Sequence, residues 1–207
     1  FDWVTLTYFD ASELETLNFV FNDNIAASGY TYEYAFVPVV GGTEGNYITN
    51  TIGAKFDGVF ICDLDTIYKF YAGVEYGTQE RVQKIGVFEP YGRKYPVVVS
   101  NGLINYSTGS FSGTILPNSY FDDKVLNRVQ MVQQKEQLMD FLTNKKAKIL
   151  KDWNGNCWLM IIVDNPAVSY AKNSGMGIAD AEANWIELGD WNNQSDLYNN
   201  GILEEAE

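Results

Sequence analysis

Aromatic residues occupy every second position in part of this chain, and this period of two constrains the fold more than any other feature. Tyr30, Tyr32, Tyr34 and Phe36 follow one another at this spacing. Side chains at alternate positions of an extended chain lie on one face, so we expect a β-strand here that ends at the glycines of residues 41–45. Shorter apolar runs between turn residues predict further strands at residues 46–52, 58–63 and 66–77.

The composition supports a mainly β fold. Aromatic residues make up 15% of the 207 residues, and most of them are Tyr (14) or Phe (12), which favour strands over helices. A chain of this length can form two small domains, each with its own hydrophobic core. We place the boundary near residues 89–94, where the sequence becomes polar and rich in turn-forming residues.

The second half combines strands with one helix. Residues 123–143 are expected to be helical, capped by Asp122 or Asp123 and ending at Asn144. An apolar stripe at helical spacing predicts the face that packs on the core: Val125, Val129, Val132, Met139 and Leu142. Two strands are expected around the turn dipeptide Asn154-Gly155, and a last strand is expected over residues 183–191.

Pro96 and the three valines that follow it are expected to open the second domain. Proline lacks a backbone donor and is accepted at the first position of a strand. Val97, Val98 and Val99 then predict a strand that is buried on both faces or covers an edge, with a turn or bulge at Asn101-Gly102. Residues 191–207 are polar enough to form a C-terminal arm that becomes ordered only on a partner.

The residue types argue against an enzyme. The chain has no histidine, which removes the usual general base and the commonest zinc ligand. Asp63 and Asp65 have the spacing of a metal-binding pair, but the same residues form turns. Residues 152–156 resemble the start of a calcium loop, yet Val163 stands where the bidentate glutamate is required. We therefore predict no catalytic residue, no cofactor and no metal.

Charge and hydropathy exclude two classes of partner. The formal net charge is −13, and no basic patch is available for phosphates, so we expect no specific nucleic-acid binding. The sequence contains no apolar run long enough to cross a bilayer and no signal-peptide pattern, so we expect no membrane insertion. Cys62 and Cys157 lie in apolar strand-like segments, which favours two buried thiols over a disulfide.

Four tryptophans in the second half divide into two groups. Trp158 and Trp185 stand in apolar strands and are expected in the core. Trp153, beside a hairpin turn, and Trp191, near the C-terminus, are candidates for exposed positions. Exposed aromatic rings are typical of carbohydrate-stacking sites and of protein interfaces, so Trp153 and Trp191 are our candidate contacts for a glycan or a protein.

Two resemblances add to this interpretation. Residues 1–90 resemble an immunoglobulin or fibronectin type III β-sandwich, on the segments YEYAFVPV and DLDTIYKFYAGVEYG. Residues 91–190 resemble bacteriophage tail proteins of the tail-tip or baseplate group, which includes distal-tail and tail-tube proteins. The motifs are Tyr95 to Val98, Asn105-Tyr106, Gly109, Ser112-Gly113, Phe141-Leu142, the hairpin Lys148 to Val163, and Trp185 to Asp190.

The tail-protein resemblance implies both a fold and a function. It implies a split β-barrel or sandwich that carries one helix and assembles with copies of itself into a ring, in contact with other tail or baseplate proteins. The protein would be made in the bacterial host cytoplasm and located in the tail of the virion, where it could contribute to host attachment. The alternative is a host-adhesion module that binds cell-wall carbohydrate through exposed Trp and Tyr side chains.

Overall fold

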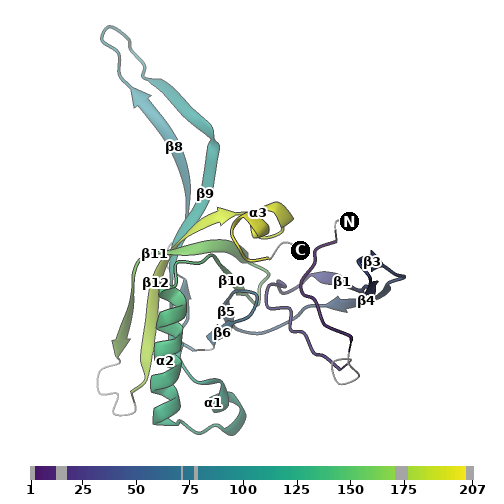
Figure 1. The fold of residues 1–207 in the computed structure, drawn as a ribbon. Coiled ribbons are helices and arrows are strands. Elements are labelled where there is room, and N and C mark those ends of the chain that lie inside the picture. Colours follow the sequence, from purple (N-terminus) through teal and green to yellow (C-terminus); the bar gives the residue numbers. More distant parts are fainter. Residues whose placement is uncertain (1–2, 13–17, 71, 77–78, 171–176, 204–207) are drawn as a thin grey trace.

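The structure is a computed structural model, and it describes residues 3–12, 18–70, 72–76, 79–170 and 177–203. Its main element is one antiparallel sheet in which β8 pairs with β9 and the other strands follow the order β6-β5-β10-β11-β12-β9-β7 (Figure 1). The strands of this sheet are β5 (Val59–Cys62), β6 (Ile67–Phe70), β7 (Glu75–Tyr76), β8 (Glu80–Phe88), β9 (Val97–Ile115), β10 (Lys148–Asp152), β11 (Cys157–Tyr170) and β12 (Ala179–Gly189). The expectation of a mainly β protein is confirmed.

The N-terminal strands form two small sheets beside the large one (Figure 1). β1 (Thr31–Phe36) pairs with β4 (Ile48–Gly53), and β2 (Val39–Val40) pairs with β3 (Thr43–Glu44). β5 and β6 instead join the large sheet, because Ile61 of β5 lies opposite Leu150 of β10. Strands from both sides of the expected boundary at residues 89–94 therefore share one sheet, and this differs from a division into residues 1–90 and 91–190.

One face of the large sheet is covered by the long helix α2 (Arg128–Thr143). The helix contributes Met131, Leu138, Phe141 and Leu142 to the buried residues. β12 supplies Ala179, Ala181, Ala183 and Trp185 to the same core cluster. Small side chains at alternate positions of β12 leave room for larger apolar groups, so the main core lies between α2 and this face.

The helical region differs from the single helix expected over residues 123–143. The structure has α1 (Asn118–Asp123) and α2, separated at Lys124, whose φ of 57° is left-handed. Asn127 rather than Asp122 or Asp123 caps α2, because its side chain accepts a hydrogen bond from Val129 N at 3.0 Å. The expected end at Asn144 is confirmed.

The valines of the predicted apolar stripe face solvent instead of the core. Val125, Val129 and Val132 are exposed, whereas Leu142 is buried. Positions 131, 138 and 142 are separated by seven and four residues, which also places them on one side of a helix. Two apolar stripes compete here, and the one with the larger side chains packs on the sheet.

The opposite face of the large sheet is covered over β5, β10 and the start of β11. The cover comes from the N-terminal segment and from the C-terminus with α3 (Gln194–Asn199). Leu197, Ile202 and Leu203 are buried against Ile149 and Leu159. The C-terminal residues up to 203 are thus part of the core, which corrects the expectation of a polar arm over residues 191–207. Residues 204–207 lie outside the described part.

A buried lysine ties the N-terminal segment to the sheet. Lys151 Nζ donates hydrogen bonds to the carbonyl oxygens of Asn24 and Ala26, both at 2.6 Å. The same ammonium lies 5.0 Å from the ring centre of Phe56, a cation–π distance. Since the side chain is almost fully buried, these contacts replace the water that the charge loses.

The hairpin expected at Asn154-Gly155 is confirmed between β10 and β11. Gly155 has a φ of 87°, a left-handed conformation that glycine adopts without strain. Asp152 Oδ1 accepts hydrogen bonds from the backbone N–H groups of Asn154 at 2.8 Å and Asn156 at 3.0 Å. Asp152 Oδ2 accepts a hydrogen bond from the side-chain amide of Asn156 at 2.8 Å, so both carboxylate oxygens organise this turn.

Candidate interaction surfaces

The most distinctive part of the surface is a long two-stranded ribbon that extends from the body (Figure 1). It consists of β8, the first part of β9 and their connecting turn, residues 80–106, and we call it the arm. β12 pairs with β9 only over Thr108 to Ile115, so along the arm β9 pairs with β8 alone. Both outer edges of this ribbon therefore have backbone groups outside the sheet ladder.

The tip of the arm is a tight turn. Arg93 N donates a hydrogen bond to Pro90 O at 3.3 Å, and Gly92 has a φ of 84°. A positive φ at the third residue is typical of a type II turn. The two apolar runs on either side of Pro90-Tyr91-Gly92 could have predicted this hairpin from the sequence, but we assigned the turn to a boundary between domains.

Apolar side chains stand on both faces of the outer half of the arm. Paired residues of antiparallel strands share a face, and Val87 pairs with Val98 while Phe88 pairs with Val97. One face thus carries Ile85, Val87 and Val98, and the other carries Phe88, Val97 and Val99. The exposed fraction is 58% for Val98, 56% for Val99 and 59% for Phe88.

The expectation of a strand buried on both faces at Val97 to Val99 is therefore wrong. Pro96 does precede the first residue of β9, as expected, but the strand it opens leaves the body of the protein. The predicted bulge is present, since the pairing shifts between Gln83 and Ile85 and leaves residues 101–104 opposite Lys84. Such an irregularity bends a strand and increases its twist.

The composition of the arm differs from that of the body. An isolated two-stranded ribbon is marginally stable in water, and large exposed apolar patches mark interaction sites in soluble proteins. The arm carries four bases against two acids, a net charge of +2, which leaves −15 on the other residues. The charged residues of the arm are Arg81, Lys84, Arg93, Lys94, Glu80 and Glu89. The arm is thus a cationic, apolar extension of an anionic body.

A second surface is the part of the large sheet that the termini leave uncovered, which we call the open half-face. β9 presents hydroxyl groups at alternate positions and β12 presents acids and an amide opposite them. These side chains are Thr108, Ser110, Ser112 and Thr114 of β9 and Asp180, Glu182 and Asn184 of β12. Thr114 Oγ1 donates a hydrogen bond to Asp180 Oδ1 at 2.6 Å. None of the seven is basic, so this surface is polar and anionic.

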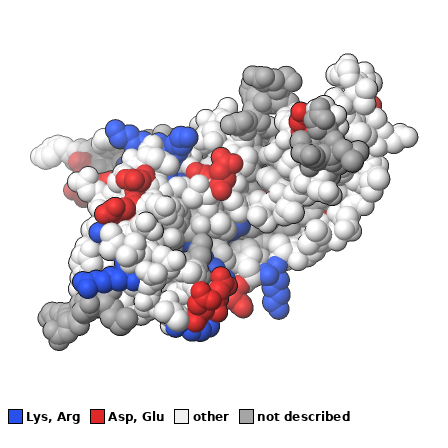
Figure 2. Space-filling view, turned by 60° about the horizontal axis from the view of Figure 1, so that its bottom comes forward, with Lys and Arg blue, Asp and Glu red and all other residues white. Residues whose placement is uncertain are grey.

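Acidic and basic groups are interspersed elsewhere on the described surface. On the face shown in Figure 2, small clusters of Lys and Arg alternate with clusters of Asp and Glu, and no broad basic patch is visible among the described residues.

The two candidate tryptophans differ in exposure. Trp153 is 53% exposed beside the β10–β11 turn, whereas Trp191 is half-buried and packs edge-on against Tyr30 at 5.4 Å between ring centres. Tyr30 also lies close to that turn, 3.9 Å from the position that a Cβ would take at Gly155. The structure thus places an exposed aromatic group at one end of the body, with Trp185 buried in the core as expected.

The buried polar groups of the sheet are structural. Burial lowers the pKa of Lys148 to about 8 and raises the pKa of Cys62 to about 12. Lys148 Nζ donates to Asn144 Oδ1 at 2.6 Å and to Lys146 O at 2.8 Å, and it lies over the ring of Phe141. These contacts hold the end of α2 against β10.

Two kinds of feature are absent from the described residues. Within the described ranges, no group of three or more His, Cys, Asp or Glu residues is arranged to hold a metal ion. No described helix is both long and apolar enough to span a membrane. The arm, the open half-face and the Trp153 region are therefore the surfaces on which a function can be argued.

A scan against models of known protein families gave no match, and a search of curated proteins also gave none.

Proposed function

We propose that this protein is a structural component of a bacteriophage tail, in the tail tip or baseplate, and that it assembles with copies of itself into a ring. The observation that carries the proposal is the arm. Its outer half exposes apolar side chains on both faces, and a ribbon of this kind is stabilised when another protein surface covers it.

Assembly rather than catalysis accounts for the way the surface is organised. An arm that binds a surface elsewhere on an identical subunit makes a heterologous contact, which leaves the arm of the second subunit free to bind a third. Such contacts close into a ring when the rotation between subunits allows it. The resemblance of residues 91–190 to tail proteins supports a position in the tail, with other tail or baseplate proteins as neighbours.

The open half-face suits the inner wall of such a ring. A surface of hydroxyl groups and carboxylates, with no base among its seven strand residues, repels a polyanion and prevents DNA from adhering as it passes. We assign this surface to the lumen, because the opposite face of the sheet is already covered by α2.

The test compares the full chain with a variant in which residues 85–100 are replaced by a short turn. We expect rings of the full chain in negative-stain electron microscopy and a monomer for the shortened variant. Circular dichroism and the unfolding midpoint should show that the body still folds. A full chain that stays monomeric at high concentration and is missing from purified virions would contradict the proposal.

A second candidate function is the binding of host cell-wall carbohydrate. The exposed Trp153 favours it because sugars stack on exposed aromatic rings, and Tyr30, which packs against Trp191, lies close to the same turn. We expect Trp153→Ala to abolish binding on a glycan array while leaving the fold intact. Trp3→Ala is the matched control, since Trp3 is also about half exposed and packs instead against Tyr47. Equal loss in both variants, or no glycan bound by the wild type, would eliminate this candidate.

A further inference from the structure

We propose that the arm of one copy binds the outer side of α2 on another copy, so that α2 is the receiving surface of the assembly. This inference rests on the proposed function, because it assumes that the chain associates with itself. It adds the two surfaces that meet and their orientation.

The outer side of α2 carries an apolar half and an acidic half. Val129, Val132, Glu136 and Asp140 are all exposed, and their spacing of three, four and four residues places them in one line along the helix. This line, which we call the outer ridge, lies opposite the residues that pack on the sheet, such as Leu138 and Leu142. Val129 is 65% exposed. The outer ridge therefore offers two valines followed by two carboxylates.

The arm offers the complementary pattern. Its tip carries the bases Arg93 and Lys94 with one acid, Glu89, and the apolar pairs of β8 and β9 begin below the tip with Phe88 and Val97, followed by Val87 and Val98. When the tip is placed beside Glu136 and Asp140, the apolar part of the arm lies beside the valines of the outer ridge. The two surfaces match in one relative orientation. In that orientation opposite charges meet at one end and apolar groups meet along the rest of the contact.

The lengths of the two surfaces also agree. The helix rises by eleven steps from Val129 to Asp140, which is about 17 Å at 1.5 Å per step. The strand from Ile85 to Glu89, the residue after the end of β8, advances by four steps, which is about 13 Å at 3.3 Å per step, and the turn adds about a few ångströms. One face of the outer arm is therefore long enough to cover the whole outer ridge.

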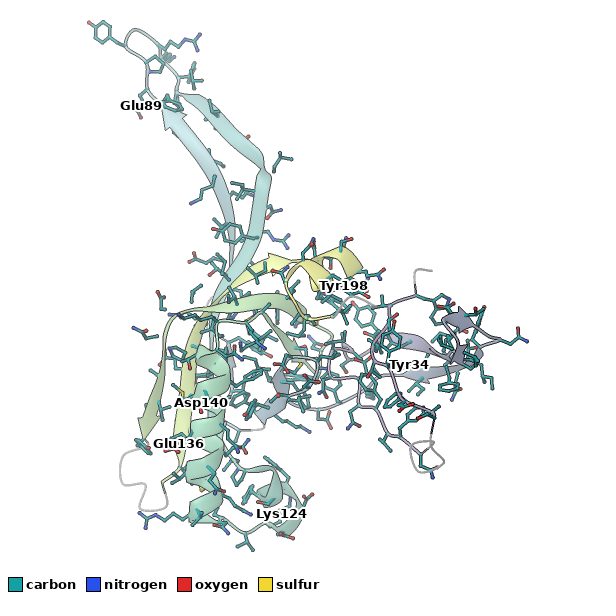
Figure 3. The ribbon with its side chains drawn as sticks, in the orientation of Figure 1. Tyr34, Glu89, Lys124, Glu136, Asp140 and Tyr198 are labelled. Carbon is teal, nitrogen blue, oxygen red and sulfur yellow. The ribbon has the colours of Figure 1, made fainter. Side chains whose placement is uncertain are left out.

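The contact must form between copies. Glu89 marks the far end of the arm in Figure 3, whereas Glu136 and Asp140 lie on α2 on the other side of the body. The arm extends away from its own helix and cannot reach it (Figure 1). A second copy is the occupant that the charges favour, because the arm is cationic and the remainder of the same chain is strongly anionic.

Charge reversal provides the decisive experiment. Glu136→Lys with Asp140→Lys reverses the acidic half of the outer ridge, and Arg93→Glu with Lys94→Glu reverses the tip. We expect each double variant to weaken self-association at least tenfold in sedimentation velocity. A chain that carries all four substitutions should recover to within about threefold of the wild type, because opposite charges then meet again.

The control is Glu33→Lys with Glu44→Lys, which changes the net charge by the same amount as the outer-ridge variant, at two exposed positions of the N-terminal sheets. It should leave association within about twofold of the wild type. A wild type that assembles but is insensitive to reversal of the outer ridge, or a fourfold variant that does not recover, overturns the contact while the proposed function stands. A wild type that never associates overturns both.

Disulfide trapping gives an independent readout. A Val98→Cys chain mixed with a Val132→Cys chain should form an interchain disulfide under mild oxidation, and neither chain alone should do so in comparable yield. Cys62 and Cys157 are buried and should not react. A Val98→Cys chain that couples equally well to Ile48→Cys, on β4 far from α2, would show that the arm binds elsewhere and would overturn the proposal.

Discussion

The two hairpins β8–β9 and β10–β11 are built from similar residues and have opposite environments. All five residues of β10 are buried, whereas the valines of the arm are largely exposed. Both hairpins have a first strand that mixes apolar and charged residues, and both have a glycine-containing turn. The difference is that β10 lies between β5 and β11 within the body, while along the arm the described strands β8 and β9 pair only with each other. Apolar residues in a strand thus do not show by themselves whether the strand is covered within its own molecule.

The largest difference is expected when one apolar side chain is truncated in each hairpin. Leu150→Ala should lower the free energy of unfolding by about 2–5 kcal/mol, because Leu150 is fully buried and a cavity would remain. Val99→Ala should change the free energy of unfolding of the monomer by no more than about 0.5 kcal/mol. Urea unfolding of both variants over a range of protein concentrations checks this, and a large loss for Val99→Ala in dilute protein would mean that the arm packs on its own body.

A buried and an exposed lysine should differ in how they affect stability with pH. The pKa of Lys148 falls to about 8 in the folded protein because its ammonium is buried. The unfolded chain therefore binds more protons between pH 8 and the ordinary lysine pKa of about 10.4, so the contribution of Lys148 to stability rises as the pH rises through this range. Relative to Lys148→Met, the free energy of unfolding of the wild type should rise by about 2–3 kcal/mol across this pH range.

Urea unfolding of the wild type and Lys148→Met at several pH values between about 7.5 and 10.5 measures this effect. Subtraction of the Lys148→Met curve removes the titration of the cysteines and tyrosines, which both proteins share. Lys84→Met on the arm is the control for the loss of one positive charge. A difference between the wild type and Lys148→Met that does not change with pH would mean that the Lys148 side chain is hydrated in solution.

The smallest effect compares two glycines of the same strand. A Cβ at Gly113, in the body, would lie 2.6 Å from Cδ1 of Phe70, whereas a Cβ at Gly102, in the arm, has nothing within 4 Å. Gly113→Ala should lower the free energy of unfolding by about 1–3 kcal/mol, as overpacked cores do. Gly102→Ala should change the free energy of unfolding by no more than about a few tenths of a kcal/mol. Thermal unfolding of the two variants tests this prediction. Equal unfolding midpoints would show that Phe70 moves aside with little loss of stability.

Local patterns predicted local structure well. The aromatic alternation over residues 30–36 corresponds to β1, and Asn154-Gly155 lies in the turn between β10 and β11. The end of α2 at Asn144 was also expected. Each of these depends on backbone geometry and on neighbours within a few residues, which a single sequence contains.

Choices between equivalent faces and partners could not be predicted in the same way. The valines of the outer ridge and the larger residues of α2 have the same periodicity, and only packing against β12 distinguishes them. β5 was assigned to a first domain because its partner β10 is distant in sequence. The arm was missed because exposed valines resemble buried ones in a sequence. Of the candidate contacts, Trp153 is exposed and Trp191 is half-buried, a difference that depends on Tyr30.

The strand order β6-β5-β10 has a consequence for biosynthesis. β5 and β6 leave the ribosome early, but the edge of β5 stays unpaired until β10 has been translated, after the whole arm and both α1 and α2. Pairing between segments so distant in the chain is slow, because a long loop must close first. During this interval a free strand edge and an apolar ribbon are presented together on nascent chains of the same polysome. Dilute expression at low temperature should therefore favour soluble protein over aggregates.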